Sequence, residues 1–290
     1  MRRDGEKAKD FAQRHNVARW YDDADALIAD PEVDAVYVAT PPNSHVDLAS
    51  RVAKAGKPCL VEKPMARNAG ECRQMVGAFK RANVPLFIAY YRRALPAFVR
   101  AKQIFDAGTL GTLTSVSTRL SLPPSSNSGW RVDPEVSGGG LFVDLASHAL
   151  NALEWIVGDF EDARGQASSL TTGGGVEDVV TLQWRCANGA LGYAAHNFAS
   201  AVHEDVLEII GTAAQLSWSC FGDGTLTLTH ADGKVEVEKH PPPKHVHLPL
   251  VQTIVDELRG NGTCPSTAAA GMRTQEHIDA AIGKFHRAKK

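Results

Sequence analysis

Two groups of residues have the types and spacing that acid–base chemistry requires. Lys63 lies between Glu62 and Pro64 directly after a short apolar run, and Asp144 precedes His148 by four positions. An ammonium group held at the end of a strand can donate to a hydroxyl and stabilise negative charge that develops on its oxygen. A carboxylate beside an imidazole can fix the tautomer of the ring and stabilise its protonated form. Together these groups are candidates for removing a hydroxyl proton.

Both patterns also have ordinary structural interpretations. Lys63 can belong to a solvated Glu–Lys pair, and Asp144 with His148 can be a simple pair on one helix face. On spacing alone the structural interpretation is favoured for both. His245 and His247 lack a third metal ligand, so we expect a solvated pair after Pro241-Pro242-Pro243 and no metal site. No G-x-S-x-G motif is present to support serine hydrolysis.

Three loops must position these side chains, because ligands of an open α/β sheet bind where loops leave the carboxyl ends of strands. The loops are 40–45, 62–64 and 91–93, and they follow short apolar runs at 35–39, 59–61 and 86–90. Helices are predicted at 6–15, 24–29, 44–55 and from an Asn68–Glu71 capping pattern to 82, with Ser44 and Asp47 as the expected cap of the third. Strands separated by such helices predict a parallel sheet, half of a doubly wound nucleotide-binding architecture.

The rest of the chain predicts a different architecture. It has a helix at 96–107, a strand at 113–120, a long loop at 121–137, a helix at 141–157 after three glycines, and a pair of helices at 248–259 and 267–288. Strand-like stretches fill 163–239 and are separated by turn signals such as Asn188-Gly189. We therefore expect a large, mainly antiparallel sheet in a second domain, with residues 1–93 forming the first domain and 94–290 the second.

The composition of the chain indicates which class of binding partner to expect. The chain has 290 residues and a formal charge of −2, which gives no general attraction to nucleic acid or anionic lipid. Its five cysteines form no C-x-x-C pair, which favours a reducing compartment, and the cytoplasm is the expected location. No apolar run approaches the roughly 18–20 residues that span a bilayer. A small molecule is therefore the expected main partner, without membrane or nucleic acid.

Taken in order, the motifs resemble the Gfo/Idh/MocA family, named for glucose–fructose oxidoreductase, inositol dehydrogenase and a rhizopine-catabolism protein. The matching pieces are Asp34–Pro42 with His45, Glu62-Lys63-Pro64, Tyr91-Arg92-Arg93, Trp130-Arg131, Gly138-Gly139-Gly140 with Asp144 and His148, and a helix pair near Ser266–Ala288. Each motif alone is weak, but the ordered set is specific and covers nearly the whole chain.

The resemblance implies an NAD(P)-dependent oxidoreductase that acts on a CH–OH group of a sugar, polyol or related small molecule. Its fold would be α/β plus α+β, with an incomplete Rossmann-like parallel sheet followed by a large open sheet that often forms the interface of a dimer or tetramer. Lys63 and His148 would be the catalytic pair, completed by Asp144. The implied cofactor-binding residues are Thr40, Pro41, Pro42, Asn43, His45, Glu62 and Lys63, and the implied substrate-binding residues are Arg92, Trp130, Arg131, Asp144 and His148.

The chain departs from the family pattern at its start. The family begins with a strand, a G-x-G-x-x-G turn, a helix and a second strand, and Met1–Asp4 resembles the end of that second strand. We therefore expect about 30 residues of a βαβ unit to be missing, with weak cofactor binding and an exposed sheet edge as consequences. Arg2, with Arg3 beside it, replaces the acidic ribose-binding residue, which favours NADP over NAD. The alternative is that both arginines are only solvated.

Two other functions remain open on this scaffold. The first is a binding or regulatory protein without catalysis. The second is a redox-neutral lyase or glycosidase that uses bound nicotinamide transiently. Specificity is expected in the loop Ser121–Arg131 and on the face of the second sheet, but the sequence does not identify the substrate.

Overall fold

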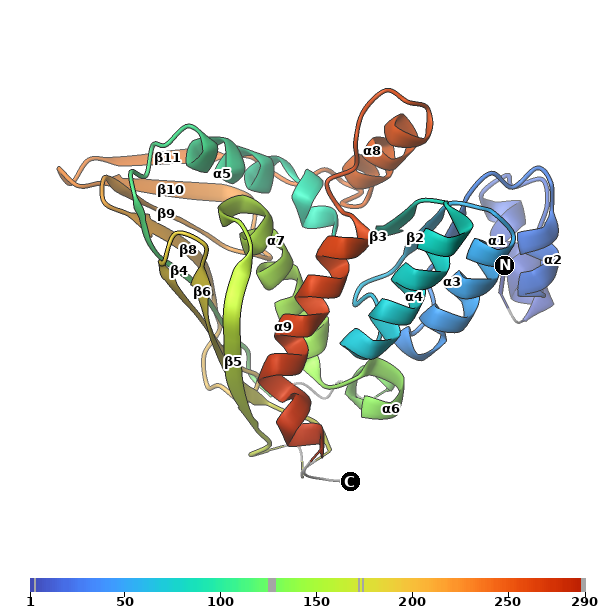
Figure 1. Cartoon of the computed structure of the whole chain (residues 1–290), viewed down its shortest axis with the longest axis horizontal. Coiled ribbons are helices and arrows are strands. Elements are labelled where there is room, and N and C mark those ends of the chain that lie inside the picture. The colour runs from blue at the N-terminus through green and yellow to red at the C-terminus, as the bar shows by residue number, and fades with distance from the viewer. Residues whose placement is uncertain (3, 125–128, 172, 174, 288–290) are drawn as a thin grey trace.

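Two separate sheets organise the structure, with helices between and around them (Figure 1). The computed structural model describes residues 1–2, 4–124, 129–171, 173 and 175–287. A parallel sheet of three strands belongs to the N-terminal part, and a sheet of eight strands forms most of the remainder. The expected fold class, a Rossmann-like parallel sheet plus a large, mainly antiparallel sheet, is confirmed.

The parallel sheet has the order β1-β2-β3 and very short strands. They are β1 (Val36–Val38), β2 (Cys59–Val61) and β3 (Leu86–Ile88). Every residue of β2 and β3 is buried, as apolar runs covered on both faces predict. Helices α3 (His45–Lys54) and α4 (Ala69–Ala82) pack on one face, and α8 (Leu248–Leu258) packs on the other. The carboxyl ends of all three strands therefore lie at one edge.

The predicted Asn68 cap is present, because Asn68 accepts from the Glu71 N–H at the start of α4. Asp4 also caps α1 (Gly5–Arg14), and Asp23 caps α2 (Ala24–Ala29). The predicted Ser44 cap of α3 is wrong. A single 3₁₀ turn, η1 (Pro42–Ser44), precedes α3, and the Ser44 hydroxyl instead donates to Thr40 Oγ1 at 2.7 Å. The loop after β1 is thus closed by its own side chains.

The second sheet has the order β11-β10-β9-β8-β4-β7-β6-β5, in which only β4 and β7 are parallel neighbours. Its strands are β4 (Leu113–Ser121), β5 (Phe160–Ser168), β6 (Val179–Cys186), β7 (Leu191–Asn197), β8 (Glu204–Gly211), β9 (Ala214–Trp218), β10 (Thr225–His230) and β11 (Val235–Lys239). Buried and exposed residues alternate along β6 and β7. This alternation indicates one covered and one uncovered face, and the helices lie on the covered side (Figure 1).

The helix predicted over 141–157 has two parts. Phe142–Ala146 form a π-helical turn, η4, and Ser147–Val157 form α7. Residues 147–154 are all buried, because α5 (Pro96–Asp106), α9 (Ala268–Arg287) and the large sheet enclose α7. This helix is therefore buried on all sides over these residues. π-Helical turns are rare and occur frequently at functional sites.

The prediction of a continuous loop over 121–137 is wrong in its second half. A 3₁₀ turn, η3 (Trp130–Val132), and a short helix, α6 (Pro134–Ser137), lie there. The Asp133 side chain caps α6 by accepting from the Glu135 N–H. Residues 125–128 of the predicted loop lie outside the described residues. The segment before the glycines is therefore structured where it approaches the first sheet.

The C-terminal segment joins the two sheets. Ser266 exchanges two hydrogen bonds with Ile88 of β3, and α9 then packs against α4 and β5 (Figure 1). The division of the chain into 1–93 and 94–290 stays a prediction, and the structure adds that α8, from the second segment, covers the first sheet. Within the described part of the chain, every helix is too short or too polar to cross a membrane.

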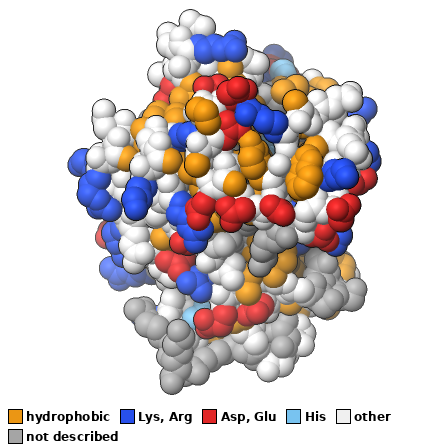
Figure 2. Space-filling view, turned by 90° about the vertical axis from the view of Figure 1, so that its right-hand side faces the viewer, with side chains coloured by type: hydrophobic (Ala, Val, Ile, Leu, Met, Phe, Trp, Pro, Cys, Tyr) orange, Lys and Arg blue, Asp and Glu red, His pale blue; other side chains and the backbone are white. Residues whose placement is uncertain are grey.

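Charge is distributed evenly over the end of the molecule that carries α1 and α2. Figure 2 shows basic and acidic side chains interspersed there, with apolar side chains between them. Several of these cations are neutralised locally, for example Arg14 by Asp10 and Arg51 by Asp47. The visible face therefore offers no extended surface of one sign.

Candidate active site

An ion pair between the two sheets is the first element of the site. Lys63 follows β2, and its Nζ lies 2.5 Å from Asp144 Oδ1 and 2.9 Å from the Asp144 carbonyl oxygen in the π-helical turn. The two side chains are 14% and 21% exposed, so they still meet solvent. The predicted pairing of Asp144 with His148 is wrong, because the carboxylate is turned toward Lys63. The π-helical winding changes the side-chain directions that an α-helical spacing of four implies.

Two glycines place the π-helical turn against the loop of Lys63. Gly138 has a φ of +87°, and a Cβ there would lie 2.4 Å from the Arg67 carbonyl oxygen. Gly140 donates its N–H to Glu177 Oε1 at 2.7 Å. Any larger residue at position 138 would separate the two loops, so the glycine run has a packing reason. Glu177 lies two residues before β6 and holds this turn through that hydrogen bond.

His148 lies one turn further along the chain and is almost completely buried. It is 3% exposed, and its ring packs edge-on against Tyr91 at 5.1 Å and Phe221 at 6.0 Å between centroids. Its Nδ1 is buried without a hydrogen-bond partner among the described residues, which leaves Nε2 to meet a ligand. Burial, followed by the charges of Arg92 and Lys63, holds the pKa of His148 well below its usual value. The imidazole is therefore neutral at neutral pH, the form that a general base needs.

The loop after β1 is held by His45. This residue is fully buried, and its ring nitrogens lie 2.7 Å from the Thr40 carbonyl and 3.2 Å from the Met65 carbonyl. The ring of His45 thus joins the loop after β1 to the loop of Lys63, and its predicted contact with a cofactor stays a prediction. Elsewhere in the predicted cofactor loop, Pro42 is buried, Thr40 and Pro41 are partly exposed, and Asn43 is exposed.

Glu62 and His247 form a second polar group beside Lys63. Glu62 accepts the hydroxyl of Tyr37, and its Oε1 lies 3.8 Å from His247 Nδ1. Burial raises the pKa of Tyr37, with the hydrogen bond to Glu62 adding to it. The His247 ring stacks on Tyr91 with centroids 4.4 Å apart. The expectation of a solvated histidine pair is therefore wrong for His247. Only its place just before a helix distinguished it in the sequence.

The two arginines that follow Tyr91 face different surroundings. Arg92 is 4% exposed, donates from Nε to the Cys220 carbonyl at 2.9 Å, and lies over the Phe221 ring at 4.3 Å. Arg93 is 5% exposed and donates to Asn151 Oδ1, the Asn151 carbonyl and the Pro265 carbonyl at 2.6, 3.0 and 2.9 Å. Arg93 thus joins α7 to the C-terminal segment, whereas Arg92 lies beside His148.

The remaining predicted residues lie at the rim or farther away. Arg131 Nε is 3.6 Å from Asp144 Oδ2, and its guanidinium stacks over the Trp130 ring at 4.5 Å. Arg2 is exposed and stacks over Phe11 at 5.4 Å, and its contacts in the described part of the chain involve no other predicted site residue. Arg3 lies outside the described residues. The structure therefore brings together the predicted catalytic and substrate residues but leaves the predicted arginine contact to a cofactor undecided.

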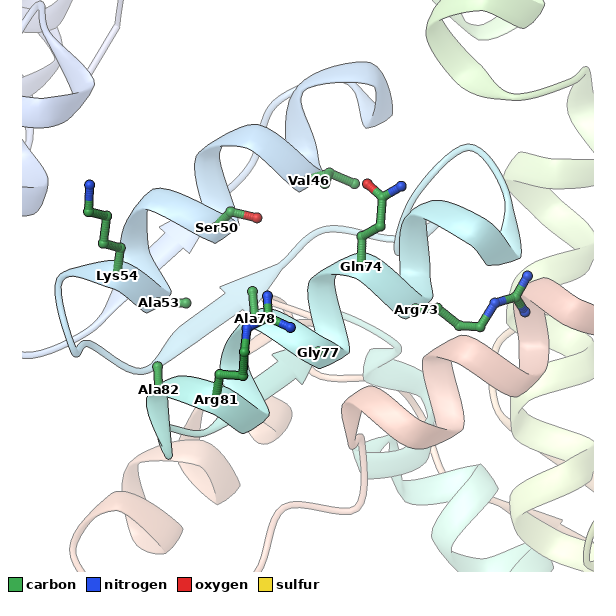
Figure 3. A pocket seen from close by; sticks show the side chains of 10 residues that line it. All are labelled: Val46, Ser50, Ala53, Lys54, Arg73, Gln74, Gly77, Ala78, Arg81 and Ala82. Atoms are coloured by element: carbon green, nitrogen blue, oxygen red, sulfur yellow. The ribbon is translucent and has the colours of Figure 1, made fainter.

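Two cavities border these elements. One of about 230 Å³ is lined in part by Tyr91, Arg92 and Phe221, and the rings of Tyr91 and Phe221 also contact His148. The other, of about 610 Å³, is a groove between α3 and α4, and Figure 3 shows that none of the predicted site residues lines it. The groove is lined by Val46, Ser50, Ala53, Lys54, Arg73, Gln74, Gly77, Ala78, Arg81 and Ala82. The smaller cavity is therefore the one related to the site.

The donor set suits a hydroxylated ligand beside a nicotinamide ring. A neutral imidazole, an ammonium paired with a carboxylate and the Glu62 carboxylate all lie near the carboxyl ends of the strands, where α/β sheets bind ligands. The partly exposed Thr40 and exposed Asn43 lie on the adjoining loop. No cluster of three or more His, Cys, Asp or Glu suited to a metal ion occurs among the described residues.

Comparison with protein families gives two adjoining matches. Residues 1–90 match the model described as an oxidoreductase family with an NAD-binding Rossmann fold, and residues 98–217 match the GFO/IDH/MocA C-terminal domain. Oxidoreductase P35 of Formosa agariphila is 32% identical over 289 residues, covering 98% of this chain and 89% of that protein. Levoglucosan dehydrogenase of Pseudarthrobacter phenanthrenivorans is 30% identical over 214 residues, covering 64% of this chain and 54% of that protein.

Solved structures show the same fold. A levoglucosan dehydrogenase in complex with NADH and levoglucosan superposes with a TM-score of 0.88 at 22% identity, covering 99% of this chain and 87% of that one. An aldose-aldose oxidoreductase from Caulobacter crescentus complexed with glycerol gives a TM-score of 0.87 at 24% identity, covering 99% and 88%. At this level of identity the likeness concerns the fold, and it extends over both sheets.

Proposed function

Because this chain belongs to the Gfo/Idh/MocA family of oxidoreductases, we propose that it oxidises or reduces a CH–OH carbon of a sugar, polyol or related small molecule. The observation that carries the proposal is that Lys63, 85 positions before His148 in the sequence, contacts Asp144 in the turn that leads directly into the helix of His148. Bound nicotinamide would supply or accept the hydride.

Each residue has a distinct role in the proposed reaction. In the oxidation direction the neutral imidazole of His148 takes the hydroxyl proton as the C–H bond gives up its hydride. The Lys63 ammonium donates to the same oxygen, which becomes a carbonyl. Asp144 holds the ammonium in place through the 2.5 Å contact. Glu62 and the exposed Asn43 border the position proposed for the nicotinamide ribose.

The names of the relatives support a cyclic polyhydroxylated substrate. They include a levoglucosan dehydrogenase, a 1,5-anhydro-D-fructose reductase and a myo-inositol 2-dehydrogenase. All three compounds present ring carbons with hydroxyl or keto groups. A site with one neutral base and one oxygen-binding cation suits the interconversion of these two groups.

We further propose NADP as the preferred nicotinamide cofactor. The support is the exposed Arg2, which can receive a 2′-phosphate where an acidic residue would hold a 2′-hydroxyl. Titration of nicotinamide fluorescence with NADPH and NADH measures the preference. Tighter binding of NADH would contradict it.

A homo-oligomer through the uncovered face of the second sheet is proposed as well. Leu191 and Tyr193 on β7 are 59% and 46% exposed, and large exposed apolar side chains on one face favour association. Light scattering after size-exclusion chromatography gives the mass directly. A monomeric mass at micromolar concentration would contradict this proposal.

The proposed activity is tested by following absorbance at 340 nm with NADP⁺ or NAD⁺ and a panel of cyclic polyols. We expect substrate-dependent formation of reduced nicotinamide whose rate falls by about 10²–10³-fold in Lys63→Met. Product formation without net change in absorbance would indicate the redox-neutral alternative. Saturable polyol binding without any turnover would indicate a binding or regulatory protein.

A further inference from the structure

Two consecutive arginines are buried to the same extent but differ in what surrounds them. Arg92 and Arg93 are 4% and 5% exposed. All the partners of Arg93 are oxygen atoms of Asn151 and Pro265, at three separate positions. Arg92 has one such partner, the Cys220 carbonyl, and its Nη1 is buried without any hydrogen-bond partner among the described residues. Burying a charged donor without a partner is costly, so the surroundings of Arg92 are incomplete.

Among the described residues, no carboxylate forms an ion pair with Arg92. The carboxylate of Asp205 is already used: it accepts the Ser219 hydroxyl and the N–H groups of Cys220 and Phe221.

Glu238, which pairs with the lining residue His240, is equally engaged. It accepts two hydrogen bonds from Arg100 at 2.7 Å and lies 2.7 Å from His240 Nε2. The guanidinium of Arg92 is instead placed over two aromatic rings, Tyr91 at 5.0 Å and Phe221 at 4.3 Å.

The Arg92 side chain lines a cavity of about 230 Å³. The other walls are mostly apolar, and they are formed by Tyr91, Leu95, Ala97, Phe98, Ser219, Cys220, Phe221, Gly222, Gly224, His240, Pro242 and Val246. Tyr91 and Phe221 also contact the His148 ring. Two of the lining rings thus also contact the proposed proton acceptor, and Arg92 is the one arginine or lysine among the lining residues.

We propose that this cavity holds the carboxylate of an acidic sugar, meaning a monosaccharide that carries one carboxylate, and that Arg92 binds that carboxylate. A guanidinium matches a planar carboxylate through parallel N–H donors, and one cation neutralises one negative charge. An apolar cavity next to it suits a small monoanion better than a dianionic phosphate. The reacting hydroxyl then lies toward His148 and Lys63, so Arg92 determines specificity and takes no part in the chemical step.

The inference rests on the proposed function, because it names the class of substrate for the same site. The test compares matched pairs that differ in one carboxylate, D-glucuronate with D-glucose and D-galacturonate with D-galactose. Binding of each sugar is measured by isothermal titration without cofactor, and turnover is measured by nicotinamide absorbance. Four forms of the protein are compared: wild type, Arg92→Met, Arg92→Lys and Arg259→Met. Arg259 is exposed at the end of α8 and controls for the loss of one positive charge.

We expect wild type to bind at least one acid about 10-fold or more tightly than its neutral partner, because a hydrogen-bonded charge contributes on that order. Arg92→Met should lose this preference by about 10- to 100-fold, with the change in KM and not in kcat. Arg92→Lys should retain part of the preference, and Arg259→Met should keep it whole. Thermal unfolding of each variant shows that the effect does not come from loss of the fold.

Several outcomes would overturn the inference. Equal binding of acid and neutral sugar by wild type would do so, as would a preference that survives in Arg92→Met. Tighter binding of D-glucose 6-phosphate than of D-glucuronate would assign the cavity to phosphate. Turnover of neutral sugars without preference for the acids would refute the carboxylate site while the proposed oxidoreductase function stands. Arg92-dependent binding of an acid without any change in nicotinamide absorbance would support the carboxylate site and contradict the proposed oxidoreductase function.

Discussion

The two cations whose charges lower the pKa of His148, Lys63 and Arg92, differ in how they are neutralised. Lys63 is partly exposed and has its counter-ion in place, since Asp144 lies 2.5 Å away. Arg92 is almost fully buried and has no carboxylate partner in the described part of the chain. The charge of Lys63 is therefore neutralised without a ligand, whereas the charge of Arg92 would be neutralised only when an anionic ligand binds. This difference separates a group that is held ready for the reaction from a group that selects the molecule that reacts.

The largest effect on catalysis is expected from a substitution of Lys63. Replacing Lys63 with Met should lower kcat by about 10²–10³-fold, because it removes the donor that stabilises charge on the reacting oxygen. KM should change little, in contrast to Arg92→Met, in which KM should carry the effect. Steady-state kinetics of both variants measure the split. If Lys63→Met altered only KM, the two sides of the site would not differ in the way described.

The second prediction concerns stability and compares Arg92 with Arg93. Arg93→Met should lower the free energy of unfolding by about 3 kcal/mol, because it leaves buried oxygens of Asn151 and Pro265 unpaired. Arg92→Met should be neutral or stabilising by about 1 kcal/mol, because it removes a buried charge that has no counter-ion. Urea denaturation of both variants in the absence of ligand gives the two values. Equal destabilisation by the two substitutions would contradict the contrast between the arginines.

The sequence predicted the pieces of this site better than their contacts. Short apolar runs and capping residues such as Asn68 located the strands and helices of the first sheet, since these signals are local. The ordered motifs identified Lys63 and His148 as candidates. Their contacts depend on features without a local signal, such as the π-helical turn that directs Asp144 to Lys63. The partner of a side chain is determined by packing between distant segments.

His247 shows the same limit. Its approach to Tyr91 follows from the way the segment before α8 returns to the first sheet, and no periodicity in the sequence reports that path. The buried His45 shows the opposite case. The residue was conspicuous in a motif, yet its ring holds two loops together through the carbonyls of Thr40 and Met65. Motif position alone does not separate a ligand contact from a structural contact.

A smaller effect is expected at His247, which lies beside the Lys63 side of the site. His247→Ala removes the stacked contact with Tyr91 and the approach to Glu62. Stacking contributes about 0.5–1.5 kcal/mol, so kcat/KM should fall by about 2- to 10-fold. His245→Ala is the matched control, because His245 is exposed two residues earlier. Equal kinetics of the two variants would remove His247 from the site.

The smallest expected effect is in the pH dependence. Burial and the charges of Arg92, Lys63 and His247 lower the pKa of His148, so the ring stays neutral as the pH falls through 6.5. The base form is lost only below that pH, at the depressed pKa. The rate of hydroxyl oxidation should therefore remain nearly constant between pH 8 and pH 6.5 and decline at lower pH. A loss of half the rate at pH 6.5 or above, in a kcat profile, would mean that the imidazole is not held in its neutral form.

The central claim is that Lys63 and His148 act on the same oxygen atom, and a double-substitution cycle on kcat tests it most directly. Lys63→Met, His148→Asn and the combined variant are compared with wild type. Groups that serve one transition state are strongly non-additive, so the account predicts a double variant scarcely slower than the slower single variant. Multiplicative losses, in which the two effects combine in full, would show that the two residues act independently and would contradict the account.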